Sequence, residues 1–100
     1  MAHSRDNRVI RLAHDYESIT VPGTATTLTA AKAALADRAF ISVETGQTRF
    51  RYDGTAPTAT EGHLLGCGDA LVIEGTQNLE NFQAIRTNTT SAVLKVTYEV

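Results

Sequence analysis

A regular alternation of apolar and polar residues runs through much of the chain. It is longest over residues 92–100, where every second residue is apolar, and it recurs over residues 16–21, 39–44 and 48–53. Successive side chains of a β-strand point to opposite faces, so each of these runs predicts a strand with one face toward a core. Shorter apolar or β-branched runs predict further strands over residues 8–12, 70–74 and 82–87.

Turn-forming residues separate these runs. Pro22-Gly23 ends the first alternating segment, and Thr45-Gly46-Gln47 separates residues 39–44 from residues 48–53. The short polar connection between two alternating runs predicts a β-hairpin across residues 39–53. Residues 53–62 begin and end with turn residues and are predicted to form an ordered surface loop.

Helical signals are confined to short segments. Residues 28–36 are rich in alanine, with Thr29 as the expected N-cap and Leu28 and Leu35 as the side chains large enough to anchor a face. We expect at most one short helix or helical turn there, closing one end of the fold. Farther along, Asn78 is placed to cap a single turn through Leu79 and Phe82.

Composition narrows the fold class. Thr, Val and Ile, the residues that favour strands, account for 27 of the 100 residues, and Trp is absent. With about ten residues from one strand to the next, we predict an all-β fold: a small β-sandwich or jelly-roll-like barrel of about six to eight antiparallel strands. Residues 1–7 are expected to form a flexible N-terminal arm, and residues 8–100 a single β domain.

Charge and hydropathy exclude several classes of protein. Nine basic and eleven acidic residues leave a formal charge of −2, which predicts no electrostatic binding to nucleic acid. No apolar run approaches the roughly 20 residues of a membrane span, and residues 1–11 are too polar for the core of a signal peptide. The single cysteine, Cys67, cannot form an internal disulfide and fits a reducing compartment.

The sequence also lacks recognisable motifs for catalysis, metal binding or nucleotide binding. The three histidines have none of the spacings that place two imidazoles on one metal, and the glycines match no phosphate-binding motif. His63 and Cys67 form the one thiol–imidazole pair that the chain offers for an enzyme. No orienting group or oxyanion hole accompanies them, so we expect no catalytic residue, no metal and no cofactor.

Basic residues supply the candidate contacts with a partner. Arg49, Arg51 and Lys95 are predicted to share a strand face with Glu44 and Glu99, either as cross-strand ion pairs or as contacts between subunits. The candidate interface residues are Arg5, Arg8, Arg11, Arg49, Arg51, Lys95 and Tyr98. The candidate contact loop is represented by Asp53, Thr55, Pro57 and Thr58.

The second half of the chain resembles a known group of proteins. It reads RFRYDGTAPTATEGHLL, then GDALVIEG, then NLENFQAIRTNTTSAVLKVTYEV. This order resembles small structural proteins of tailed bacteriophages and prophages, which pair an R-x-R/D-G-T-x-P-T loop with a C-terminal IR…SA.L.VTY strand. The match lies in residues 49–62, 68–75 and 84–98, about half of the chain.

The resemblance implies a non-enzymatic component of the virion. It would be a capsid decoration, head-fibre or tail-associated protein that is made in the host bacterial cytoplasm. It would assemble as a homo-oligomer, with a trimer favoured, and would bind the major capsid protein or another virion protein. The exposed surface of a small β domain, and the need to protect its edge strands, are compatible with such assembly.

A ligand-binding domain without catalysis is the alternative interpretation. A cupin-like or lectin-like domain would use the loops at residues 53–62 and 87–91 to hold a sugar or another small ligand. Only Tyr16, Tyr52 and Tyr98 could stack on a sugar ring, and the last two lie in expected strands.

Overall fold

The computed structural model describes residues 10–100; the predicted arm over residues 1–7 therefore lies outside the described residues. Within that range the chain forms eight strands and two short helices. The strands are β1 (Ala13–Val21), β2 (Thr26–Thr27), β3 (Arg38–Thr45), β4 (Thr48–Arg51), β5 (His63–Leu65), β6 (Ala70–Glu74), β7 (Gln83–Arg86) and β8 (Ala92–Glu99). The helices are α1 (Ala30–Ala33) and α2 (Thr76–Asn81).

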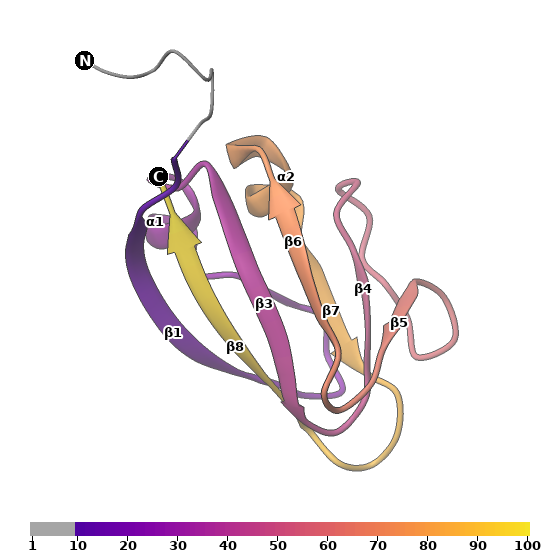
Figure 1. Ribbon diagram of the computed structural model, residues 1–100. Coiled ribbons are helices and arrows are strands. Elements are labelled where there is room, and N and C mark those ends of the chain that lie inside the picture. Colours follow the sequence, from indigo (N-terminus) through magenta and orange to yellow (C-terminus); the bar gives the residue numbers. More distant parts are fainter. Residues whose placement is uncertain (1–9) are drawn as a thin grey trace, which may run out of the picture.

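The strands form two antiparallel sheets of four strands each (Figure 1). The front sheet has the order β1-β8-β3-β6, and the back sheet has the order β2-β7-β4-β5. Strand β1 pairs with β8, β2 with β7, β3 with β6 and β4 with β5. The first strand thus pairs with the last, the second with the second-last, and so on, which is the pairing pattern of a jelly roll. The predicted all-β class, strand number and sandwich architecture are confirmed.

The predicted hairpin across residues 39–53 is wrong. Strands β3 and β4 form where the alternation places them, but β3 pairs with β6 and β8 in the front sheet, whereas β4 pairs with β5 and β7 in the back sheet. The intervening turn carries the chain from one sheet to the other at the end of the sandwich opposite the helices (Figure 1). Gly46 allows this crossing: its φ is 77°, and a Cβ atom there would lie 3.0 Å from the Cα atom of Ala92.

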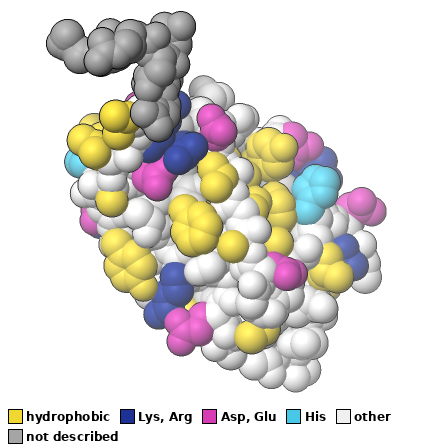
Figure 2. All heavy atoms as spheres, viewed as in Figure 1, with side chains coloured by type: hydrophobic (Ala, Val, Ile, Leu, Met, Phe, Trp, Pro, Cys, Tyr) yellow, Lys and Arg dark blue, Asp and Glu magenta, His cyan; other side chains and the backbone are white. Residues whose placement is uncertain are grey.

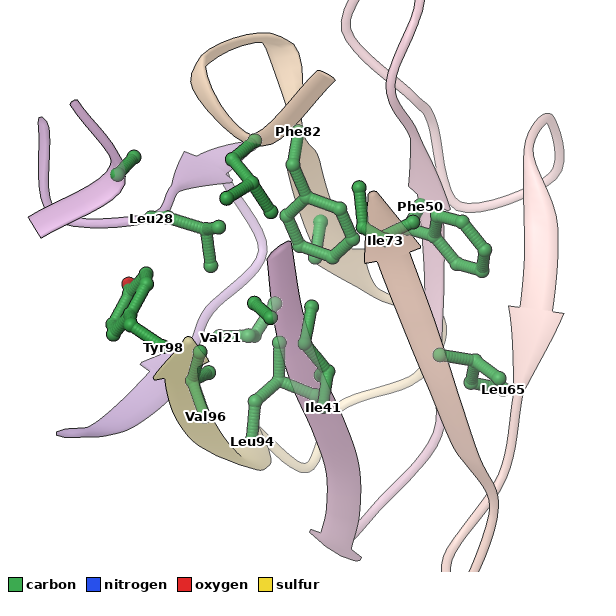
Figure 3. Close-up of a cluster of buried hydrophobic side chains, with 14 of the residues drawn as sticks. Val21, Leu28, Ile41, Phe50, Leu65, Ile73, Phe82, Leu94, Val96 and Tyr98 are labelled. Atoms are coloured by element: carbon green, nitrogen blue, oxygen red, sulfur yellow. The ribbon is translucent and has the colours of Figure 1, made fainter. Parts of the chain in front are cut away.

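The hydrophobic core fills the space between the two sheets (Figure 3). Front-sheet residues point into it at every second position, including Ile41, Leu94 and Val96, which are at most 1% exposed. Phe50 and Phe82 contribute aromatic rings from the other side. The alternation seen in the sequence is thus the alternation between core and solvent, most completely in β8.

Both helices lie at one end of the sandwich (Figure 1). Helix α1 falls inside the expected segment, and Leu28 is buried, but Leu35 is 66% exposed and Ala33 and Ala36 pack into the core instead. Thr29 does occupy the N-cap position. Its hydroxyl, however, donates to the Glu17 carboxylate on β1 and does not cap the helix.

Helix α2 is a second helix, where at most one was expected. It begins at Thr76, with Gly75 in the N-cap position at a φ of 98°. Asn78 therefore lies inside the helix and does not cap it; its side-chain amide donates to the carbonyl oxygen of Glu74 at 2.8 Å. Leu79 and Phe82, the two residues of the expected turn, are both buried.

The segment expected to form a strand over residues 8–12 is not assigned to a strand in its described part, residues 10–12. Leu12 nevertheless exchanges two backbone hydrogen bonds with Val100, each 3.0 Å long. These bonds continue the ladder of β1 and β8 by one residue pair beyond the start of β1.

Candidate functional site

The outer face of the front sheet carries a row of exposed apolar side chains. Antiparallel register aligns Tyr16 on β1 with Thr97 on β8, Thr97 with Phe40 on β3, and Phe40 with Val72 on β6. We call Tyr16, Phe40 and Val72 the apolar row. Their exposed fractions are 55%, 45% and 45%. Figure 2 shows hydrophobic side chains gathered on this face.

Ion pairs lie on both sides of the apolar row. On one side Arg38 contacts Glu99, and on the other the ammonium of Lys95 lies 3.3 Å from the Glu44 carboxylate. Lys95 also donates to the hydroxyl of Ser18 on β1. Lys95 therefore forms an ion pair with Glu44 across strands, which is one of the two arrangements expected for this face, while Glu99 is paired with Arg38. The charges beside the row are already neutralised within the chain.

Arg49 and Arg51 do not share that face, contrary to the prediction. They lie on β4, in the back sheet, because the chain crosses between sheets before β4. The Arg49 guanidinium donates to the carbonyl oxygens of Ala59 and Gly62, at 3.1 and 2.9 Å. It braces the loop between β4 and β5, a role that strand alternation gives no means of predicting.

Arg51 pairs with Asp53, the first residue of the predicted contact loop. Its Nε and Nη2 atoms donate to the two carboxylate oxygens of Asp53, and the backbone N–H of Thr55 donates to one of them at 3.3 Å. The hydrogen bond from Arg51 is the main reason that the pKa of Asp53 falls to about 2. The carboxylate also raises the pKa of Arg51.

The remaining loop candidates divide between surface and interior. Thr55 and Thr58 are exposed, as a contact loop requires, but Pro57 is buried and cannot present a contact. Thr58 and Glu61 exchange two backbone hydrogen bonds, from Thr58 N–H to Glu61 at 2.9 Å and from Glu61 N–H to Thr58 at 3.3 Å. The loop is therefore closed on itself, as the prediction of an ordered surface loop requires.

Tyr98 is not an interface residue of the folded chain, because its side chain is 0% exposed. Its hydroxyl donates to Glu17 on β1, whose other carboxylate oxygen accepts the hydroxyl of Thr29 at 2.6 Å. Burial, together with this hydrogen bond to a carboxylate, raises the pKa of Tyr98. The alternation had placed Tyr98 on the inward face of β8, and the polar group Glu17 is what allows a tyrosine there.

The N-terminal basic residues are only partly described. Arg5 and Arg8 lie outside the described residues. The guanidinium of Arg11 lies 3.4 Å from the carboxylate of Asp37, which is 60% exposed, so this contact is a surface ion pair. Pairs of this kind contribute roughly 0–1 kcal/mol to stability.

His63 and Cys67 contact different parts of the molecule. The His63 ring lies 5.2 Å from that of Phe50, whereas the thiol of Cys67 is exposed and lies 3.1 Å from the carbonyl oxygen of Glu44. No hydrogen bond joins the two side chains among residues 10–100. This arrangement gives the thiol–imidazole interpretation no geometric support.

A hollow of about 740 Å³ opens where β4 ends and β5 begins. It is lined by Arg51, Tyr52, Asp53, Glu61, Gly62, His63 and Asn78. The sequence had singled out Arg51, Asp53 and the aromatic ring of Tyr52 separately. Asn78 comes from α2, and no spacing along the chain could have joined it to the others.

The described residues contain no group of three or more His, Cys, Asp and Glu side chains that could hold a metal ion. Among them, neither helix has the length and apolar character that crossing a membrane would require. In comparisons with known proteins, no family model matches the chain, and no curated protein matches it significantly.

Proposed function

We propose that this protein is a non-enzymatic structural component of a bacteriophage virion, of the capsid decoration or head-fibre kind. It self-associates, with a trimer as the favoured state, and binds the major capsid protein or another virion protein at the particle surface. It is made in the cytoplasm of the bacterial host. The observation that carries the proposal is the apolar row on the outer face of the front sheet.

The apolar row supports the proposal because strand register fixes the order of its side chains, with Thr97 of β8 between Tyr16 and Phe40. Three large side chains, each about half exposed, are held in line by strand register, so their surface cannot be hidden by a rotation of one side chain. Burying such apolar surface in an interface contributes a favourable free energy of about 25 cal/mol per Å² to association. Exposed apolar clusters on small domains commonly mark contacts with another protein.

The segments that resemble phage proteins are spread over both sheets. Residues 49–62 contain most of β4 and the loop braced by Arg49, residues 68–75 contain β6, and residues 84–98 contain most of β7 and β8. They therefore include β6 and β8 of the front sheet and β4, β7 and the braced loop of the back sheet. A shared framework of this kind is what a structural component needs.

Light scattering after size-exclusion chromatography tests the self-association. We expect the full chain to elute as an oligomer, and Phe40→Glu to shift it toward the monomer because a charge then lies in the middle of the apolar row. Leu64→Glu is the matched control, since Leu64 is 49% exposed on the back sheet. A monomer at every accessible concentration, or equal effects of the two variants, would refute this mode of association.

Immunogold electron microscopy tests the location. Particles released by a host that carries the gene are labelled with an antibody against the chain, and we expect regular labelling of intact virions. Particles of a deletion mutant serve as the control. Absence of the chain from purified virions, shown by mass spectrometry as well as by microscopy, would refute a role as a virion component.

A further inference from the structure

The hollow beside β4 and β5 has the dimensions of a ligand site. Its volume of about 740 Å³ falls within the range of roughly 300–1,000 Å³ that is usual for small-molecule sites. Its walls come from β4, β5, the loop between them and α2, which brings Asn78 to the site. The apolar row lies on the other sheet, so the two features are independent.

A ladder of aromatic rings fixes one wall of the hollow. The buried ring of Phe82 stacks on Phe50 with a centroid distance of 5.5 Å, and Phe50 stacks on Tyr52 at 6.3 Å. Phe82 is 1% exposed and Tyr52 is 41% exposed, so the ladder leads from the core to the surface. Tyr52 therefore presents an aromatic face whose orientation is set by the core.

The loop that contributes Glu61 and Gly62 to the hollow is also held in place. Arg49 donates to two carbonyl oxygens of this loop, and Pro57 within it is buried. At Gly62 the φ angle is 136°, and a Cβ atom would lie 3.1 Å from the carbonyl oxygen of Phe50. Only glycine fits this close approach. The hollow is thus largely formed before any ligand arrives, which lowers the entropy cost of binding.

The polar groups of the hollow indicate the chemistry of the ligand. Arg51 is paired through Nε and Nη2 with Asp53, which leaves Nη1 without a hydrogen bond to any described residue. Glu61 adds a carboxylate acceptor, and His63 and Asn78 add groups that can donate or accept. Because Arg51 is already neutralised and Glu61 lies nearby, a phosphate or another anion would meet no uncompensated cation.

We propose that this hollow binds a neutral saccharide, with one sugar ring stacked on Tyr52. Hydroxyl groups both donate and accept hydrogen bonds, so they match a lining that offers acceptors on Asp53 and Glu61, both kinds of group on Asn78, and a donor on Nη1 of Arg51. The apolar face of a pyranose ring matches the exposed aromatic face. Binding at this site adds glycan recognition to a protein whose proposed contacts with other subunits use the front sheet.

An array of neutral and anionic oligosaccharides, probed with the full chain, gives the first test. We expect binding to at least one neutral glycan and weaker or no binding to phosphorylated and sulfated ones. The bound glycan is then titrated into ¹⁵N-labelled protein, where the amide shifts should cluster at Tyr52, Asp53, His63 and Asn78. Failure to bind any neutral glycan, preference for the anionic ones, or shifts centred elsewhere would overturn the proposal.

Paired tyrosine variants provide the decisive control. Tyr52→Ala should weaken binding by about tenfold or more, whereas Tyr16→Ala, which removes a similarly exposed ring from the front sheet, should change it by less than about twofold. Equal effects of the two variants would overturn the role of Tyr52. An unmodified chain that binds a neutral glycan but stays monomeric would count against the proposed assembly alone and leave this site standing.

Discussion

The two sheets of the sandwich are built in different ways. The front sheet has strands of 9, 8, 8 and 5 residues, whereas the back sheet has strands of 2, 4, 4 and 3. Long strands satisfy their backbone groups through the ladder itself and alternate strictly between core and solvent. The front sheet therefore provides both the largest continuous part of the core and an outer face whose side chains are ordered by register.

The strands of the back sheet are short, and side chains add hydrogen bonds to backbone carbonyl oxygens of this sheet and its loops. Thr48 is fully buried, and its hydroxyl donates to the carbonyl oxygen of Ile85 at 2.8 Å. The hydroxyl of Thr87 donates to the side chain of Gln47 at 2.8 Å, and Arg49 holds the long loop. The outer face of the front sheet is the surface proposed for assembly, whereas the loops of the back sheet line the hollow.

Leucine truncations in the two sheets should show the largest difference. Leu94 on β8 is 1% exposed and central, whereas Leu65 on β5 is 9% exposed on an edge strand. We expect Leu94→Ala to lower the free energy of unfolding by about 4 kcal/mol and Leu65→Ala by about 2 kcal/mol, because an edge site can collapse around the lost volume. Urea denaturation measures both values, and equal losses would contradict a core centred on the front sheet.

Removal of the buried tyrosine hydroxyl should have the next largest effect. In Tyr98→Phe the Glu17 carboxylate loses a donor in a partly buried position, which should cost about 1–3 kcal/mol of stability. Tyr52→Phe is the control: Tyr52 is 41% exposed, and its hydroxyl makes no hydrogen bond to another described residue, so its cost should stay below about 0.5 kcal/mol. If thermal unfolding gave the same midpoint for both variants, the link between β1 and β8 through Glu17 would be unimportant.

The smallest expected effect concerns the pKa of the Asp53 carboxyl group in the loop after β4. Asp53 has a pKa of about 2, below its ordinary value of 3.8, so its pairing with Arg51 stabilises the folded loop above about pH 4 and is lost as the pH falls toward 2. In Arg51→Ala the pKa of Asp53 should return toward 3.8. Carboxyl chemical shifts followed by NMR measure both values, and an unchanged pKa in the variant would show that Arg51 is not the cause.

The candidate site could be predicted only in fragments. Asp53 and the loop after β4 follow from turn chemistry, and Lys95 with Glu44 follows from strand alternation. The hollow cannot be predicted in this way, because it forms only where Asn78 of α2 lies beside the end of β4. Tyr98 shows the opposite limit: its inward direction followed from the alternation, but its burial excludes the interface role that was expected of it.

Local sequence by itself determined where most strands lie and which of their residues face the core. A period of two suffices for this, because side chains on a strand alternate between its faces whatever its neighbours are. It also determined where the chain must turn, at Pro22-Gly23 and Gly46. Strand β6, over residues 70–74, forms with the bounds that its apolar run predicted.

Only the tertiary structure decided which strands are neighbours. Residues 45–47 could equally have closed a hairpin within one sheet or connected one sheet to the other, because both solutions use a short polar turn and leave the inward faces apolar. The choice depends on contacts distant in the sequence, such as the packing of Gly46 against Ala92 and the pairing of β3 with β8. The apolar row exists because β1, β8, β3 and β6 are neighbours, and the hollow exists because Asn78 of α2 lies beside the end of β4 and the start of β5.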